Sequence, residues 1–254
     1  MTDDLSLIYA LEERAANALP APASLLYDGW ILRFASGYPR RANSVWFFQP
    51  STLPLDEKID FCERHYWATK GRAVFRLTPL VDEALAKRLE ARGYTLDAPT
   101  QVSVTESLAI PEGLPPHKGS IELCDHITPE WIADNGRLHA FTPEQSDSYG
   151  AIYAKILTPT ACVRIWADDR VVGVAAAVVE RGWMGVFSVI TDPAARGQGH
   201  ATAALAALFA WGQNHGALRA YLQVMENNAV ALRLYDRFGF TRLYGYRYLQ
   251  KDPS

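Results

Sequence analysis

The stretch DPAARGQGHATAAL, residues 192–205, joins two runs of different character. The residues before it, WMGVFSVIT, are apolar and β-branched as in a buried strand, whereas those after it are rich in alanine and leucine as in a helix. Gly197 and Gly199 lie at the junction. The first N–H groups of a helix lack partners and carry a partial positive charge, and glycine lets a phosphate approach the main chain. The stretch therefore predicts a strand–turn–helix unit that suits a phosphate or diphosphate group.

Spaced glycines also occur in tight turns that bind nothing, so two glycines alone do not establish a phosphate site. A dinucleotide-binding fingerprint that began at Gly197 would need a third glycine at position 202, where the chain has Thr202. A nucleotide-triphosphatase loop would need Gly-Lys-Ser or Gly-Lys-Thr, which the stretch lacks. A dinucleotide-binding oxidoreductase stays an alternative that the spacing does not favour.

A second motif follows the strand-like run ALRAYLQV. In MENNAVALRLYDRFGF, residues 225–240, Asn228 is a suitable helix N-cap and Gly239 a suitable helix stop. Arg-x-x-Gly-x-Ala at 196–201, followed by Asn-x-x-Ala-x-x-Leu-Tyr-x-x-x-Gly-Phe at 228–240, resembles the GNAT family of acetyl-CoA-dependent N-acetyltransferases. The resemblance covers residues 119–254, whose predicted elements follow the order of that family's fold.

The resemblance implies direct transfer of an acetyl group from acetyl-CoA, as cosubstrate and without a metal, to a primary amine. The backbone of residues 189–191 would pair with the pantetheine arm like an added strand, and the amides of the glycine turn would hold the diphosphate. Asn228 would steady the arm, and Tyr235 would protonate the departing thiolate. The cofactor-binding residues expected on this basis are Val189, Ile190, Thr191, Arg196, Gly197, Gln198, Gly199, His200, Ala201, Thr202, Asn228 and Tyr235, and the expected catalytic residue is Tyr235.

The chemistry of the transfer limits what the acid and the base contribute. The leaving thiol, judged from cysteine, has a pKa of about 8.5, so help from Tyr235 should be worth ~10² in rate. The ring of Tyr235 could instead only fill the core. Some relatives use a glutamate to deprotonate the amine, but the corresponding position here looks to be Gln223, which cannot act as a base. His200 in the turn is more typical of a structural residue than of a catalyst. We assign no base; the candidates are Glu226, Glu180, Glu144 and His139.

The chain is expected to form two halves. Residues 110–119, IPEGLPPHKG, have three prolines and two glycines, so we predict one domain over 1–115 and a catalytic domain over 116–254. In the second half, two segments that begin Thr-Pro-Glu predict helices, and residues 161–191 predict a meander of three antiparallel strands. The first half predicts a helix over 4–18, two strands around a loop, and then a helix, a strand, a helix and a strand.

The two halves share a pattern, although two strand–helix–strand units could also match by coincidence. AVFRLTPLVDEALAKRLEARGYT aligns without gaps on RAYLQVMENNAVALRLYDRFGFT, with Leu89 opposite Tyr235 and Asp82 opposite Asn228. In the first half, the helix that comes before this aligned segment is entered through the turn QPSTLPLDEK. This turn has no glycine to admit a phosphate. We therefore expect an α+β fold with a mixed sheet, a tandem of two GNAT copies of which the first is degenerate and walls the acceptor pocket. Residues that could bind an acidic acceptor there, or serve only packing, are Trp30, Arg33, Arg40, Arg41 and Asn43.

Composition narrows the partners and the compartment. Of 254 residues, 25 are basic and 28 acidic, which offers no basic surface for nucleic acid or an anionic membrane. The acidic N-terminal segment, the lack of a long apolar run and three widely spaced cysteines predict a cytoplasmic protein with reduced thiols. We expect an acyltransferase that acts on a small-molecule or peptide amine; the acceptor and the oligomeric state stay open. The alternative is a module that binds acetyl-CoA as a sensor or regulator and acetylates nothing.

Overall fold

The computed structural model describes residues 2–253, which fall into two compact units. The first unit comprises Met1–Gln101 and Tyr244–Ser254, and the second comprises Val102–Leu243. This division does not follow the boundary predicted between residues 115 and 116. The end of the chain belongs to the first unit because its last strand pairs with a strand of that unit, and linker composition carries no information about such a distant pairing.

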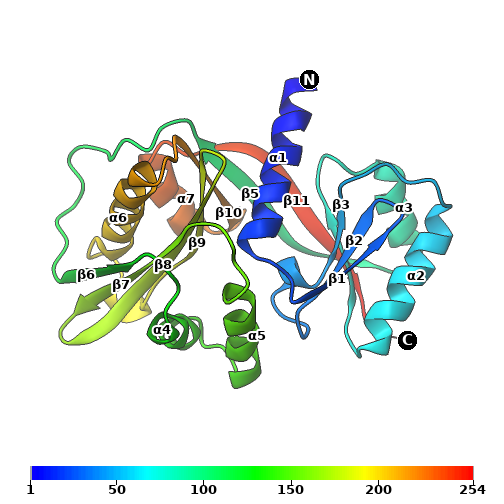
Figure 1. The fold of residues 1–254 in the computed structure, drawn as a ribbon, viewed down its shortest axis with the longest axis horizontal. Coiled ribbons are helices and arrows are strands. Elements are labelled where there is room, and N and C mark those ends of the chain that lie inside the picture. The colour runs from blue at the N-terminus through cyan, green and yellow to red at the C-terminus, as the bar shows by residue number, and fades with distance from the viewer. Residues whose placement is uncertain (1, 254) are drawn as a thin grey trace. The chain divides into compact units, whose positions relative to one another are not determined.

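The first unit places three helices around its strands (Figure 1). The helices are α1 (Thr2–Ala18), α2 (Leu55–Ala68) and α3 (Glu83–Ala91), and a 3-10 turn is η1 (Arg40–Ala42). The strands are β1 (Ala23–Tyr27), β2 (Trp30–Phe34), β3 (Val45–Phe47) and β4 (Ala73–Leu77), with parts of β5 (Thr95–Thr105) and β11 (Thr241–Lys251), which cross the unit limits. The strand order β1-β2-β3-β4-β11 puts the C-terminal strand beside β4, antiparallel to it.

The first strand-like run of the sequence is two strands, where sequence analysis expected one. The chain turns at Asp28 and Gly29, which have positive φ of 42° and 81°, and β1 and β2 pair antiparallel across the turn. An Asp-Gly pair between apolar runs is the usual signal of a two-residue hairpin, and this signal was missed. A Cβ on Gly29 would lie 2.4 Å from the carbonyl oxygen of Gln49, so the turn admits only glycine there.

The second unit is a mixed sheet with helices packed against it. Its helices are α4 (Pro129–His139), α5 (Pro143–Tyr153), α6 (His200–Asn214) and α7 (Ala229–Arg237), and a 3-10 turn is η2 (Pro193–Ala195). Its strands are β6 (Ser120–Cys124), β7 (Thr160–Ala167), β8 (Arg170–Glu180), β9 (Trp183–Thr191) and β10 (Arg219–Met225), in the order β10-β9-β8-β7-β6. The predicted meander is confirmed, since β7, β8 and β9 are antiparallel, whereas β10 runs parallel to β9.

The two helices predicted from Thr-Pro-Glu are also present. Thr128 caps α4 by accepting a hydrogen bond from the backbone N–H of Trp131 at 3.1 Å. Thr142 and Gln145 form a reciprocal capping box at the start of α5. Each cap satisfies backbone donors that a helix start leaves without partners.

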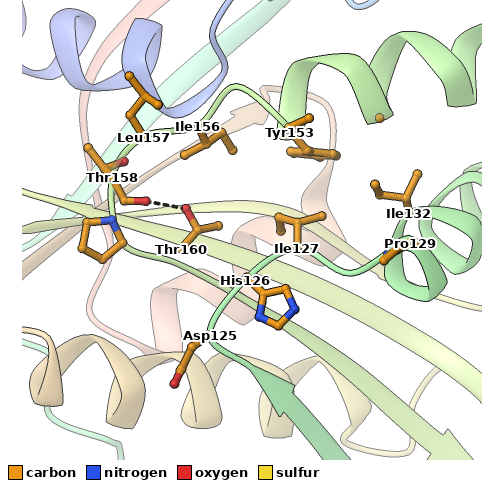
Figure 2. Close-up of a pocket in the computed structure, with 13 residues that line it drawn as sticks. Asp125, His126, Ile127, Pro129, Ile132, Tyr153, Ile156, Leu157, Thr158 and Thr160 are labelled. Atoms are coloured by element: carbon orange, nitrogen blue, oxygen red, sulfur yellow. Dashed lines mark hydrogen bonds between the residues drawn. The ribbon is translucent and has the colours of Figure 1, made fainter.

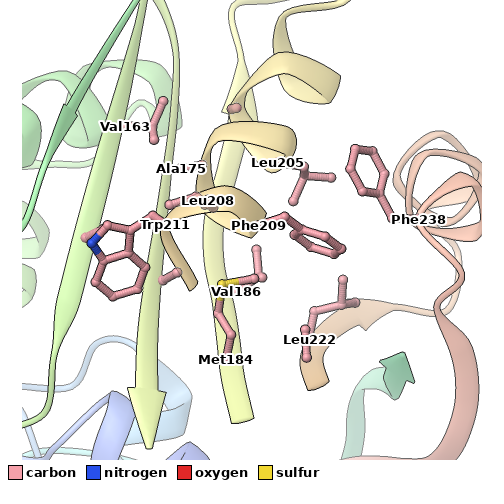
Figure 3. Packing of buried hydrophobic residues seen from close by; sticks show 14 of the residues in the cluster. Val163, Ala175, Met184, Val186, Leu205, Leu208, Phe209, Trp211, Leu222 and Phe238 are labelled. Carbon is pink, nitrogen blue, oxygen red and sulfur yellow. The ribbon is translucent and has the colours of Figure 1, made fainter. Parts of the chain in front are cut away.

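Helix α6 presents its apolar side to the sheet of the second unit. Leu205 and Phe209 are fully buried in one cluster with Ala175 of β8 and Val186 of β9 (Figure 3). Burying a large apolar side chain contributes about 1.5–3 kcal/mol, so this packing is strong enough to hold the start of α6 beside the end of β9. The predicted glycine turn lies between these two ends.

The gapless alignment of the two halves holds in three dimensions. It maps the whole of α3 onto the whole of α7, from the first residue to the last. Asp82 caps α3 by accepting from the N–H of Ala84 at 2.8 Å, and Asn228 caps α7 by accepting from the N–H of Ala231 at 3.1 Å. The same strand–helix–strand unit therefore occurs twice along the chain.

Strand β6 was not predicted, and β11 followed only from the repeat of the strand–helix–strand unit. Strand β6 is short and largely exposed, so its sequence lacks an apolar run. Between β5 and β6 the chain has neither helix nor strand, as linker composition suggested, yet Leu114 of this connection packs on the core of the second unit. Within residues 2–253, no helix combines the length and the apolar content that crossing a membrane requires.

Candidate active site

Strands β9 and β10 separate at the end that carries the predicted cofactor residues. Their parallel pairing extends only as far as Val186 and Leu222. The strands themselves continue to Thr191 and Met225 without further pairing to each other among the described residues. One edge of β9 is therefore open over residues 189–191, where another extended chain could add main-chain hydrogen bonds.

A bulge in β9 lies immediately before this open edge. The pairing of β9 with β8 shifts register between Phe187 and Ile190, and Ser188 has a positive φ of 51°. Backbone strain of this kind costs on the order of 1–3 kcal/mol and needs surrounding contacts to hold it. The side-chain oxygen of Ser188 is 2.8 Å from the hydroxyl of Tyr153 at the end of α5. This contact holds the bulge at the point where the two strands part.

The turn into α6 leaves a run of backbone donors unpaired. None of the described residues accepts a hydrogen bond from the N–H groups of residues 197–202. Gly197 and Gly199 have φ of 78° and 80°, and the first bond at the helix start joins the N–H of Ala203 to the carbonyl of Gly199 at 2.9 Å. Unpaired N–H groups at a helix start attract anions, so the residues present fit a diphosphate.

One side of this turn is covered by the connection between β5 and β6. A Cβ on Gly199 would lie 3.0 Å from the carbonyl oxygen of Pro116, so glycine alone fits without a shift. The rings of His117 and His200 meet edge to face, with 5.1 Å between centroids. His200 is only 2% exposed, and neither of its ring nitrogens has a partner among residues 2–253. Burial, and then the neighbouring His117, lower the pKa of His200, so its ring is neutral and only its backbone N–H is available to a ligand.

Arg196 and Asn228 both keep donors available. The side chain of Arg196 is exposed, and its Nε makes a long contact of 3.5 Å with the carbonyl oxygen of Thr191. Asn228 uses its side-chain oxygen for the cap of α7, and its NH₂ group donates to none of the described residues. The side chain of Thr202 is buried, so this residue can offer a ligand only its N–H.

Tyr235 lies on α7 with its ring in the core of the second unit. The side chain is 9% exposed and packs edge to face with Phe240, at 5.9 Å between centroids. Burial raises the pKa of Tyr235 to about 12. No described residue hydrogen-bonds to its hydroxyl, which stays protonated at neutral pH as a general acid must. The packing role and the acid role of Tyr235 are compatible.

The three carboxylates considered as bases are engaged by their neighbours. Glu226 forms an ion pair with Arg242 at 2.8 Å, and Glu180 forms one with Arg181 at 3.1 Å. Glu144 lies in the first turn of α5, where its own backbone N–H lowers its pKa. A paired or stabilised carboxylate is a weaker base, so none of these three is marked out for the role.

His139 is the fourth candidate base. Its Nδ1 is 3.0 Å from the carbonyl oxygen of Asn135, and its ring stacks on Phe141. Burial lowers the pKa of His139, with the bond to Asn135 acting in the opposite direction. The ring is therefore neutral at pH 7, and it is a poor acceptor for the proton of a strongly basic amine.

The first-half residues suggested for an acceptor wall are held by contacts inside the first unit. Arg33 is buried and donates to three backbone carbonyls, and Asn43 bonds to the backbone of residues 35–39. Trp30 lies in the core, and Arg40 forms an ion pair with a carboxylate of β5. These contacts favour the packing role that the sequence left open.

A pocket of about 590 Å³ lies beside α4 and α5 (Figure 2). Its wall comes from the β6–α4 and α5–β7 connections and the adjoining helix ends, with polar groups at Asp125, His126 and Thr160. None of the predicted cofactor residues lines it. Sequence analysis missed the pocket because its walls come from segments that no motif connects.

Comparison with known proteins places these features in a family. A family model described as Probable histone acetyltransferase Rv0428c C-terminal matches residues 5–249. The Uncharacterized N-acetyltransferase YobR of Bacillus subtilis (strain 168) is 24% identical over 245 residues, which are 95% of this chain and 97% of that protein. Both matches run through the first half as well as the second.

Solved structures show the same fold at low identity. A GCN5-related N-acetyltransferase from Kribbella flavida has a TM-score of 0.66 and 16% identity, and the match covers 97% of this chain and 95% of that one. A tandem GNAT protein from the clavulanic acid biosynthesis pathway has a TM-score of 0.58 and 14% identity, over 72% and 64% of the two chains. The predicted α+β fold and its tandem arrangement are confirmed.

Proposed function

Since the chain belongs to the Rv0428c C-terminal acetyltransferase family, we propose that it transfers an acetyl group directly from acetyl-CoA to a primary amine. It is an acyltransferase of the GNAT type, as its relatives are. We place the reaction in the cytoplasm, a proposal supported by the odd number and wide sequence spacing of the three cysteines.

This proposal is supported by two backbone stretches, one soon after the other along the chain, each with hydrogen-bonding groups that have no partners among the described residues. The open edge of β9 over residues 189–191 leads, through one short turn, to the unpaired N–H groups of residues 197–202. We assign the pantetheine arm of the cofactor to the first stretch and its diphosphate to the second, with Arg196 and Asn228 adding donors. Each favourable charge at a helix start contributes about 0.3–1 kcal/mol, so several donors must act together for useful affinity.

Tyr235 is proposed as the general acid. When bound, acetyl-CoA supplies the acetyl thioester. The hydroxyl of Tyr235 holds its proton at neutral pH because burial raises its pKa to about 12, and no described residue competes for that proton. A leaving thiol with a pKa of about 8.5 needs modest help, so the expected contribution is ~10² in rate.

Each of the four candidate bases is ion-paired, stabilised by hydrogen bonding or a poor proton acceptor. A site with such weak bases favours an amine that gives up its proton easily. An amine with a pKa near about 10.4, such as a lysine side chain, needs a dedicated path for its proton. An α-amino group, with a pKa of about 7.7–8.0, is partly deprotonated in water already. We therefore propose a small-molecule or peptide amine of modest pKa as the acceptor.

A second candidate is a sensor that binds acetyl-CoA without transferring the acetyl group. The ion pairs of Glu226 and Glu180 and the amide at Gln223 favour it, because they leave the site without an assigned base. The protonated hydroxyl of Tyr235 favours catalysis.

Thermal unfolding with acetyl-CoA or NAD, followed by thiol release with a panel of amines, tests these proposals. A ligand at about 100 times its dissociation constant stabilises the protein by ~2.7 kcal/mol. We expect stabilisation by acetyl-CoA alone and faster thiol release with amino-acid esters than with lysine-like amines. Stabilisation by acetyl-CoA without thiol release from any amine would identify a sensor, and stabilisation by NAD instead would identify an oxidoreductase.

A further inference from the structure

Two cysteines that are far apart in the sequence face each other in the sheet. Cys124 ends β6, and the antiparallel register places it directly opposite Cys162 of β7. Opposite residues in an antiparallel pair have Cα atoms about 4.5–5.5 Å apart, which lies within the range of about 4.4–6.8 Å that a disulfide spans. The backbone therefore already has the spacing that a disulfide needs.

The neighbouring pair shows that side chains on this face meet across the two strands. Glu122 lies opposite Arg164, two residues along each strand from the cysteines, and the two side chains form an ion pair at 3.0 Å. Successive side chains of a strand alternate between faces, so Cys124 and Cys162 share the face of this ion pair. Burial is the main cause that raises the pKa of Cys162, and electrostatic interaction with Cys124 acts in the same direction.

The two thiols differ in access, which sets the order of events. Cys124 is half-buried on an edge strand, whereas Cys162 is buried and its thiol donates to the carbonyl oxygen of His126 at 3.2 Å. Burial raises the pKa of Cys162 to about 12. The third cysteine, Cys62, is fully buried in the first unit, where burial raises its pKa as well. An oxidant therefore reaches Cys124 first.

We propose that Cys124 and Cys162 are a reversible disulfide site whose co-reactant is a low-molecular-weight disulfide. The Cys124 sulfur attacks one sulfur of the small disulfide, whose S–S bond breaks and releases a first small thiol. The Cys162 sulfur then attacks the Cys124 sulfur and releases the second small thiol. Two protein thiols lose two electrons, the small disulfide gains them, and the two thiol protons end on the released thiols.

The disulfide would close a covalent loop that contains the residues lining the pocket of the second unit. Every residue that lines the pocket lies between Cys124 and Cys162 in the sequence, and Asp125 and His126 follow Cys124 directly (Figure 2). Oxidation would close this segment, with α4 and α5, into a covalent loop and tie the edge strand β6 to β7. Closing a loop of this size should raise the midpoint of thermal unfolding by roughly 5–10 °C.

Exposure of the full-length protein to oxidised glutathione tests the proposal. Thiol titration under denaturing conditions should fall from three thiols to one, and peptide mapping should find Cys124 joined to Cys162. The second step should be slower than the first and faster at higher pH, because only a thiolate attacks. The rise in unfolding midpoint should disappear on reduction.

Two variants make the test specific. Cys62→Ala should still form the disulfide and lose both remaining thiols, whereas Cys124→Ser should keep its two thiols free and show no rise in unfolding midpoint. Cys124→Ala repeats the second measurement without a new hydroxyl. A wild-type protein that stops at a mixed disulfide on Cys124, or a Cys124→Ser variant that loses thiols at the wild-type rate, would overturn the proposal.

Discussion

Helices α2 and α6 follow corresponding strands in the two copies of the fold, and the turns that lead into them differ in what fills them. The turn into α6 leaves the N–H groups of residues 197–202 without an acceptor among the described residues. In the turn into α2, the carboxylate of Asp28 accepts from the N–H groups of Thr52, at 3.0 Å, and Leu53, at 2.9 Å. The first copy thus has a carboxylate of its own where the second has free donors.

Lys58 completes the filled turn. Its side chain is fully buried, with Nζ 3.0 Å from Asp28 and 4.1 Å from the centre of the Trp30 ring. Burial lowers the pKa of Lys58, and the N–H of Leu53 leads the contacts that hold the pKa of Asp28 well below its usual range. An anion that entered this turn would meet a carboxylate. The carboxylate of Asp28 would therefore repel an anion at this turn, although the strand–helix framework persists.

The hairpin that supplies Asp28 has a counterpart in the second copy. The turn between β7 and β8 contains Asp168 and Asp169, which have positive φ of 49° and 57° and are exposed. In the described chain neither aspartate bonds to the turn into α6. One hairpin carboxylate that accepts from the turn before the helix therefore distinguishes the first copy from the second.

The largest expected effect is that of Gly199→Glu, which puts a carboxylate into the open turn. Its φ of 80° and the nearby carbonyl of Pro116 also oppose any side chain. We expect the affinity for acetyl-CoA, measured by calorimetry, to fall by at least about 100-fold, which is ~2.7 kcal/mol. Gly93→Glu is the control, since Gly93 has a φ of 84° with open space around it in the first copy. A folded Gly199→Glu protein with wild-type affinity for acetyl-CoA would show that the turn into α6 does not bind the cofactor, and so does not differ from the turn into α2 in this respect.

Tyr235→Phe should lower turnover by about 100-fold and leave the dissociation constant of acetyl-CoA within about twofold, because the hydroxyl donates a proton but does not anchor the cofactor. The corresponding position of the first copy has Leu89, which cannot donate a proton. Tyr94→Phe removes a buried hydroxyl from the first copy and should leave turnover unchanged. Steady-state and binding measurements on both variants decide whether Tyr235 is an acid or a packing residue; unchanged turnover of Tyr235→Phe would make it the latter.

Asp28→Asn should lower the midpoint of thermal unfolding at neutral pH, because it removes the charge that faces the buried Lys58. The pKa of Asp28 is lower in the folded protein than its usual value of about 3.9, so its contribution is present above that pH and lost as the pH falls below it. The difference in unfolding midpoint between Asp28→Asn and the wild type should therefore disappear at acidic pH. Asp168→Asn, the matched exposed position of the second copy, should show no such difference at any pH.

His200→Leu should give the smallest effect, a flatter dependence of stability on pH. The pKa of His200 is lowered in the folded state, so the neutral ring contributes stability above the unfolded value of about 6.5, and this is lost as the pH falls. Wild-type stability should decline between about pH 7 and pH 5, and the variant should decline less. Thermal unfolding across this range, with His65→Leu in the first unit as control, measures the difference. Parallel curves for wild type and His200→Leu would show that this ring does not titrate on unfolding.

Much of the fold was predictable because it depends on local signals. The caps at Thr128, Thr142 and Asn228 and the periodic apolar runs specify helices and strands from a few neighbouring residues. The hairpin at Asp28 carried an equally local signal that was overlooked. Strand β6 had none, because its residues are mostly exposed and its pairing partner supplies its stability.

The sequence by itself determined the glycine turn into α6, the capped helix that carries Tyr235, and the repeat of one strand–helix–strand unit, since each depends on residues within a single turn or element. Only the tertiary structure decided that β9 and β10 part beyond Val186, that Asp28 fills the turn into α2, and that Cys124 faces Cys162. These contacts join residues far apart along the chain, and their free energy comes from register and packing that no local pattern encodes.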